Sequence, residues 1–158
     1  QLTDLGHQLA PEIATIGFAT KSASLPQATR PLFNLEEGNI SYGIGIHGEE
    51  GYRIVPFQSS EILANEIISK LRLHYHWKHG DQFILLVNNL GTTSNLEMGI
   101  FINDLLQLLE IEGVTITFIK SGTFMTSLDM AGISVTLFPV KNKQWLEALN
   151  APTTAFAW

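Results

Sequence analysis

The chain has 158 residues, of which 45% are hydrophobic and 15% charged, and its formal net charge is −6. This length predicts one domain with an apolar core, and the few scattered basic residues argue against a nucleic-acid-binding protein. The sequence has no cysteine, which excludes disulfides and a thiol nucleophile, and no apolar run approaches the ~18 residues of a membrane-spanning helix.

The first residues predict a short helix. Three leucines at helical spacing precede Pro11, and because proline interrupts a helix we expect it to end near Ala10. The chain begins with Gln1 and opens as if within a helix, so we expect it to be part of a longer protein.

A strand and a hairpin are predicted next. Residues 13–20 favour a strand, and residues 21–39 form a loop with two prolines and a turn signal. Residues 40–46 alternate large apolar with small or polar side chains, which indicates a strand, and residues 52–57 are its hairpin return. This hairpin predicts a mixed sheet.

The remaining elements alternate between helices and strands. Ser59 can cap a helix with an amphipathic pattern, and the near-continuous apolar run that begins at Phe83 is typical of a buried parallel strand. The predicted elements are strand 83–91, helix 92–113, strand 114–120, strand 133–140 and helix 141–152. The order predicts an α/β or α+β domain.

A glycine-rich segment raises the question of a nucleotide site. Gly43, Gly45 and Gly48 match the G-x-G-x-x-G pattern, which binds a pyrophosphate when it opens a helix. Here Glu49 and Glu50 follow, and two carboxylates would repel a diphosphate. We therefore do not interpret the segment as a dinucleotide site.

Three clustered histidines suggest metal binding, but their spacing does not support it. Only His76 and His79 would share a helix face, and neither has a third ligand nearby in sequence. We favour exposed side chains close to a helix C-terminus, where the helix dipole favours a cation.

Two polar segments follow or precede buried strands. Residues 88–98 form a turn after a strand, where ligands bind in open α/β sheets, but the same residues could form an Asx-turn and a helix cap. The sequence leaves both interpretations open. Asp129, in the segment Thr-Ser-Leu-Asp-Met, is better interpreted as a turn residue than as a site residue.

His47 is the candidate nucleophile. It lies at the end of an apolar strand, in a tip bracketed by glycines and beside acidic residues. Histidine is largely neutral near pH 7, and a neutral imidazole is a nucleophile. An ordinary turn histidine is the alternative.

Three motifs carry a resemblance to a known family. The segments GIGIHGEEGY, LLVNNLGTTSNLEM and MTSLDMAGISVTLF, in this order, resemble the DhaK-type subunit of dihydroxyacetone kinases. The likeness extends from about Thr15 to the end and covers the C-terminal half of such a two-domain subunit. It implies that residues 1–158 are a single two-layer domain with a mixed sheet covered by helices, without the subunit's N-terminal domain.

The resemblance also implies a chemistry. In this family the histidine of the G-I-H-G-E motif, here His47, attacks the ketone carbon of dihydroxyacetone and forms a covalent hemiaminal. Gly45, Gly48 and Gly51 would shape the tip around the substrate. Glu49 would orient the imidazole or, alternatively, be a solvated turn residue.

Cofactors and partners follow from the same resemblance. This chain would carry no cofactor, and the phosphoryl group would come from ATP or ADP with Mg²⁺ on a partner nucleotide-binding subunit. A homodimer and a cytoplasmic location are expected, and the isolated domain is not expected to be active. Where the family usually has proline this chain has Glu50, and residues 24–31 also depart from the kinase pattern.

Two other functions stay open, the first because of these departures and the second because half of such a subunit's site is absent. Some short-form relatives in the family bind dihydroxyacetone through the same histidine without being kinases, and they co-activate a transcription regulator. A dimerisation domain without a ligand of its own is the third alternative.

Overall fold

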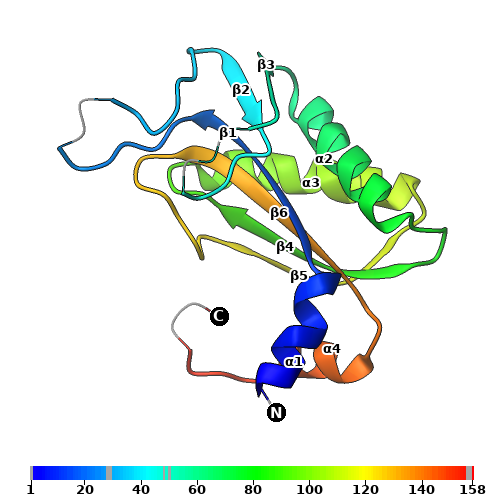
Figure 1. The fold of residues 1–158 in the computed structure, drawn as a ribbon. Coiled ribbons are helices and arrows are strands. Elements are labelled where there is room, and N and C mark those ends of the chain that lie inside the picture. The colour runs from blue at the N-terminus through cyan, green and yellow to red at the C-terminus, as the bar shows by residue number, and fades with distance from the viewer. Residues whose placement is uncertain (1, 28–29, 48, 50, 156–157) are drawn as a thin grey trace.

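The computed structural model describes residues 2–27, 30–47, 49, 51–155 and 158. Within them, a six-stranded sheet has the order β3-β2-β1-β6-β4-β5 (Figure 1). The strands are β1 (Ala14–Lys21), β2 (Asn39–Tyr42), β3 (Arg53–Pro56), β4 (Gln82–Asn89), β5 (Thr115–Gly122) and β6 (Ala131–Pro139). The helices are α1 (Leu2–Leu9), α2 (Ser60–Tyr75), α3 (Asn95–Ile111) and α4 (Lys143–Asn150), with a 3₁₀ turn at Ala10–Glu12.

The sheet is mixed, as the hairpin predicted. Strand β4 pairs in parallel with β5 and antiparallel with β6, and the pairs β1–β2, β2–β3 and β1–β6 are antiparallel. Strand β6 therefore lies between β1 and β4, which brings the first and last strands of the chain together in the centre of the sheet. The predicted α+β class is confirmed.

Helices α2 and α3 cover one face of the sheet (Figure 1). Their buried side chains, such as Ile67 and Leu105, pack with the inward residues of the central strands, such as Leu85 and Val135. Helices α1 and α4 contribute Leu9 and Trp145 to an apolar cleft against the other face. None of the helices in the part of the chain that the structure describes has the length and apolar character of a membrane span.

Both long helices begin at serine caps. The Ser59 side chain accepts a hydrogen bond from the backbone N–H of Ile62, as predicted for α2. Helix α3 begins with a reciprocal capping box between Ser94 and Glu97. The cap interpretation of the polar turn after β4 is therefore confirmed.

The strand expected over residues 40–46 is shorter than predicted, because β2 ends at Tyr42. Gly43 has φ of +81°, and its N–H donates to the Gly17 carbonyl, which turns the backbone away from strand geometry. Ile44 is buried in a second small apolar cluster with Phe33 and Leu90. The apolar residues that continue the alternation beyond Tyr42 thus pack into this cluster and do not extend the strand.

Candidate functional site

The three motif segments meet at one end of the sheet. The loop after β2 carries His47, the end of β4 carries Asn88 and Asn89, and the loop before β6 carries Ser127. The Ser127 hydroxyl donates a hydrogen bond to the carbonyl oxygen of Ile46, and its backbone N–H donates to the Leu90 carbonyl. One serine therefore joins the histidine loop to the strand end.

His47 lies in the turn that follows Ile46, and its side chain is 80% exposed. Both oxygens of the Glu49 carboxylate contact His47. The His47 backbone N–H donates to Glu49 Oε2 at 3.1 Å, and the imidazole Nδ1 lies 3.2 Å from Glu49 Oε1. The orienting role predicted for Glu49 stays a prediction, but these contacts are the ones it requires.

The Glu49 carboxyl is held in its ionised form. Its own backbone N–H donates to it, and the side chain and backbone N–H of His47 add further hydrogen bonds, so that its pKa lies below the ordinary value. A carboxylate beside Nδ1 favours the tautomer in which Nδ1 carries the proton. We assign this tautomer from the contact, and it leaves the lone pair on Nε2.

The predicted glycines differ in what surrounds them. A Cβ on Gly45 would meet the Glu49 carboxylate, whereas a Cβ on Gly51 would meet the Ser41 hydroxyl and the Tyr42 carbonyl. Gly45 therefore leaves room for the carboxylate that contacts His47, and Gly51 lets the returning chain pass close to β2. Gly48 and Glu50 lie outside the described residues.

The two asparagines at the end of β4 hold loops together. The Asn88 carboxamide accepts hydrogen bonds from the backbone N–H groups of Phe124 and Met125 and donates to the Met125 carbonyl. The Asn89 carboxamide accepts from Gly91 and Thr93 and donates to the Thr93 carbonyl. For residues 88–98 the sequence left open a ligand site or an Asx-turn with a helix cap. The asparagine amides close turns here, which supports the second interpretation.

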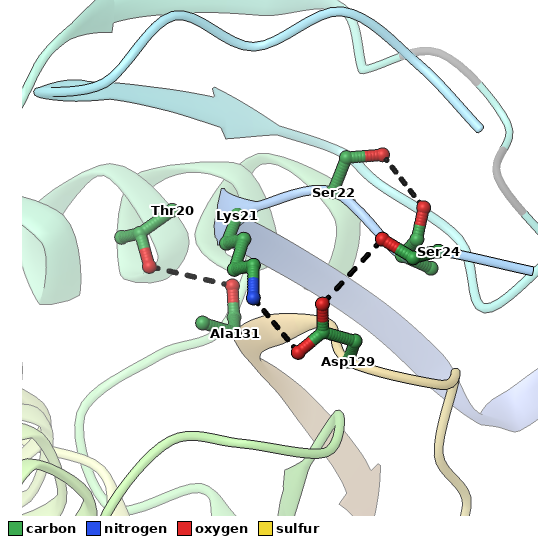
Figure 2. Close-up of polar contacts among 7 residues, drawn as sticks. Thr20, Lys21, Ser22, Ser24, Asp129 and Ala131 are labelled. Carbon is green, nitrogen blue, oxygen red and sulfur yellow. Dashed lines mark hydrogen bonds and ion pairs between the residues drawn. The ribbon is translucent and has the colours of Figure 1, made fainter. Parts of the chain in front are cut away.

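A polar cluster that the sequence did not reveal connects β1 with the loop before β6 (Figure 2). Lys21 Nζ lies 2.7 Å from Asp129 Oδ1, and the Ser24 hydroxyl donates to Asp129 Oδ2 at 3.4 Å. Lys21 lowers the Asp129 pKa, and Asp129 has the left-handed φ of 64°. Asp129 lies in a turn, as the sequence favoured, and it also forms an ion pair with Lys21 that the sequence did not predict.

The three clustered histidines do not gather around a common point. His76 is the left-handed C-cap of α2, His74 packs edge-on against Tyr75, and the His79 ring lies beside Gly113. Among the described residues no group of three or more histidine and acidic side chains could hold a metal ion.

Comparisons with known proteins agree on one family. Residues 1–157 match the family model described as the Dak1 domain. The chain is 46% identical over 160 residues to the DhaKLM operon coactivator DhaQ of Lactococcus lactis, and 39% identical over 158 residues to the dihydroxyacetone-binding subunit DhaK of that strain's PTS-dependent dihydroxyacetone kinase. Each match covers 100% of this chain and 48% of the relative, so the chain spans about half the length of these curated relatives.

Solved structures agree with the sequence matches. A structure of a dihydroxyacetone kinase operon co-activator, Dha-DhaQ, superposes with a TM-score of 0.92 at 45% identity, over 99% of this chain and 49% of that chain. The dihydroxyacetone kinase of C. freundii in complex with AMP-PNP and Mg²⁺ superposes with a TM-score of 0.82 at 27% identity, over 95% of this chain and 27% of that chain.

Proposed function

The chain belongs to the Dak1 domain family, and from this premise we propose that it is the part of a dihydroxyacetone-binding protein that holds the ketone covalently on His47. The observation that carries the proposal is the pair of contacts from the Glu49 carboxylate to the backbone N–H and Nδ1 of His47. These contacts support the orienting role proposed for Glu49, because they engage Nδ1 of an exposed imidazole and leave Nε2 to react with the ketone.

The covalent step uses the lone pair on Nε2. This nitrogen attacks the carbonyl carbon of dihydroxyacetone, a carbon–nitrogen bond forms, and the π electrons of the carbonyl move to its oxygen. The oxygen gains a proton and Nδ1 gives up its proton, so the product is a neutral hemiaminal with no atoms lost. Glu49 lies where it can stabilise the cationic ring during attack and accept the Nδ1 proton.

The chemistry selects the ligand. Glycerol has no carbonyl and cannot form the adduct, whereas a pocket that relied on shape would discriminate poorly between molecules of such similar size. The imidazole nitrogen carries no further proton to lose, so the adduct cannot dehydrate to a neutral imine and remains reversible. A short polyhydroxy ketone is therefore the substrate class that we propose.

The bound ketone serves one of two functions, and the first is phosphorylation in a kinase. In a kinase subunit, its terminal hydroxyl is phosphorylated by a nucleotide with Mg²⁺ held on a partner subunit. The C. freundii kinase complex with AMP-PNP and Mg²⁺ supports a nucleotide donor in the family. The Lactococcus lactis kinase is named PTS-dependent, which supports a second source of the phosphoryl group in the family.

The second candidate is a co-activator that senses the ketone without phosphorylating it. The 46% identity to the DhaQ coactivator and the TM-score of 0.92 with a solved co-activator support it, as the 39% identity to DhaK supports the first candidate. The partner would then be a transcription regulator. The covalent chemistry at His47 is common to both candidates.

The wider setting is part of the same proposal. We infer that residues 1–158 form one domain of a longer polypeptide, since the matched relatives are about twice as long. The resemblance of its motifs implies that this domain is the C-terminal half of the polypeptide and that the polypeptide is a homodimer. A cytoplasmic location follows from the proposed partners, because nucleotide donors and transcription regulators both act there.

A crystal of the complete polypeptide that contains these residues, soaked with dihydroxyacetone, tests the covalent link. We expect continuous electron density from His47 Nε2 to a tetrahedral carbon, and none after a glycerol soak. A planar, unattached ketone would contradict the proposal. Phosphorylation with the nucleotide-binding subunit, compared with ketone-dependent binding to a regulator, then separates the two candidates.

A further inference from the structure

The loop that carries His47 is closed at its base by Tyr52. This loop connects β2 to β3 at one edge of the sheet, and Tyr52 is the residue directly before β3 (Figure 1). The Tyr52 backbone N–H donates to the Tyr42 carbonyl at 2.8 Å. This bond joins the two ends of the loop, so the position of the loop depends on what holds Tyr52.

The Tyr52 ring also covers the start of the loop. A Cβ on Gly43 would collide with this ring, which shows that the ring packs directly on the Gly43 backbone. The ring stacks against Tyr42 as well, with centroids 6.3 Å apart and planes inclined by 27°. Because Tyr42 is buried, it is a firm support for the ring. The backbone and the ring of Tyr52 thus contact both residues at which the chain leaves β2.

Helix α2 holds the Tyr52 side chain from the outside. Glu66 Oε1 accepts the hydrogen bond of the Tyr52 hydroxyl at 2.9 Å, and Lys70 Nζ lies 4.7 Å from the ring centroid, as in a cation–π contact. Glu66 and Lys70 are four residues apart and therefore share one face of the helix. Two contacts from one turn of α2 thus fix a ring that is otherwise half-exposed.

The hydroxyl that contacts Glu66 keeps its proton. Partial burial and the Glu66 carboxylate raise the pKa of Tyr52, so the hydroxyl donates at neutral pH. A hydrogen bond to an ionised acceptor is stronger than one between neutral groups. Glu66 also accepts a hydrogen bond from Arg53 Nη1 at 3.3 Å, which places a cation beside the carboxylate. The link between helix and loop is therefore a charge-assisted one.

We propose that Tyr52 is a positioning residue for His47: anchored to Glu66 of α2, it holds both ends of the loop and keeps the imidazole where it reacts with the ketone. This inference rests on the proposed covalent chemistry at His47. Tyr52 acts through the loop backbone and not on the reacting atoms. Without the anchor the loop would populate other arrangements, and only the molecules with the loop in place would react.

Tyr52→Phe tests the anchor, because it keeps the ring and removes the hydroxyl. The complete polypeptide is mixed with ¹³C-labelled dihydroxyacetone to measure adduct formation and is then chased with unlabelled ketone to measure breakdown. We expect formation to be about 3- to 10-fold slower, since fewer molecules have the loop in place, and breakdown to be unchanged. A residue that touches the ketone would change both rates. An unchanged rate of formation, or an equal change in breakdown, would overturn the proposal.

Variants of Glu66 test the partner. Glu66→Ala should slow formation as much as Tyr52→Phe does, and Glu66→Gln, which keeps an oxygen for the hydroxyl, should restore most of the rate. The double variant Tyr52→Phe/Glu66→Ala should be no slower than either single variant, because both remove the same contact. Arg72→Ala, which removes an ion pair of α2 with Glu112, is the matched control and should change neither rate. Additive losses in the double variant would contradict the link.

Amide hydrogen exchange without ketone separates this proposal from the covalent chemistry. The Gly43 N–H donates to the Gly17 carbonyl at 2.7 Å and reports on the base of the loop. We expect it to exchange about 3- to 10-fold faster in Tyr52→Phe, because the loop opens more often. Unchanged exchange at Gly43 would overturn the role of Tyr52 whatever the ketone does. Faster exchange together with no adduct in the wild type would support the hold of Tyr52 on the loop and contradict the covalent chemistry at His47.

Discussion

The Ser127 hydroxyl donates a hydrogen bond to the carbonyl oxygen of Ile46, the residue directly before His47. The same serine donates its backbone N–H to the Leu90 carbonyl, directly after β4. Three segments that are distant in the sequence therefore converge on the backbone that carries the proposed nucleophile.

Replacing Ser127 by alanine should loosen this backbone. The Ile46 carbonyl would lose its partner in a partly buried position, and we expect the free energy of unfolding to fall by about 1–2 kcal/mol. Affinity for dihydroxyacetone should fall as well, because His47 would be less well positioned. Denaturant unfolding and ketone titration measure the two effects, with Ser121→Ala, which changes an exposed serine on β5, as control. Full ketone affinity in a destabilised Ser127→Ala variant would exclude a positioning role.

Glu49→Gln should weaken ketone capture with little effect on stability. Glutamine keeps an oxygen for the His47 backbone N–H, but it loses the charge that stabilises the ring cation and the ability to take its proton. A charge-assisted hydrogen bond is about twice as strong as a neutral one, so we expect about a 5- to 10-fold weaker adduct. Calorimetric titration with dihydroxyacetone measures it. An unchanged affinity would favour the alternative that Glu49 is only a solvated turn residue.

Two glycine substitutions should separate folding from function. The Cβ of Gly51→Ala would press on the Tyr42 carbonyl, which is fixed in the sheet, and should cost about 1–3 kcal/mol of stability. The Cβ of Gly45→Ala would press on the mobile end of Glu49, which can move aside. We therefore expect Gly45→Ala to unfold like the wild type but to bind the ketone more weakly. The reverse pattern in unfolding curves would contradict these assignments.

Tyr75 should give the fold a measurable dependence on alkaline pH. Its hydroxyl accepts the Ala14 N–H at 2.8 Å and lies 2.6 Å from the Leu137 carbonyl, and burial raises its pKa from 10.0 to about 12. The folded state thus holds this proton more tightly than the unfolded state does. The resulting stability is complete below pH 10 and is lost as the pH rises through about 12.

Tyr75→Phe is the test of that dependence. It should lower the free energy of unfolding by about 1–2 kcal/mol at neutral pH, because the buried partners remain unpaired. It should also flatten the decline in stability between pH 10 and pH 12 in denaturant titrations. An equally steep decline in the variant would assign the alkaline transition to other groups.

The order and type of the elements could be predicted from the sequence because caps and periodicity are local signals. Ser59 before an amphipathic run and the apolar run from Phe83 correspond to α2 and β4. The end of β2 could not be predicted, since Ile44 continues the alternation but packs into a separate apolar cluster with Phe33 and Leu90. The end of β2 therefore depends on the burial of Ile44 against residues distant in the sequence, which a local pattern does not reveal.

The site was predictable to a similar extent. The motif around His47 pointed to the proposed nucleophile and to its contact with Glu49, which is two residues away and therefore a local contact. Lys21 and Asp129 pair across β1 and the loop before β6, which only the antiparallel β1–β6 pairing brings together.

The most direct test of the account compares the wild type with His47→Ala in the complete polypeptide, using dihydroxyacetone labelled with ¹³C at its carbonyl carbon. For the wild type we expect a protein-bound tetrahedral carbon signal, and for His47→Ala we expect none although the fold is intact. If the variant captured the triose to the same extent as the wild type, the imidazole would not be the point of attachment and the central claim would be wrong.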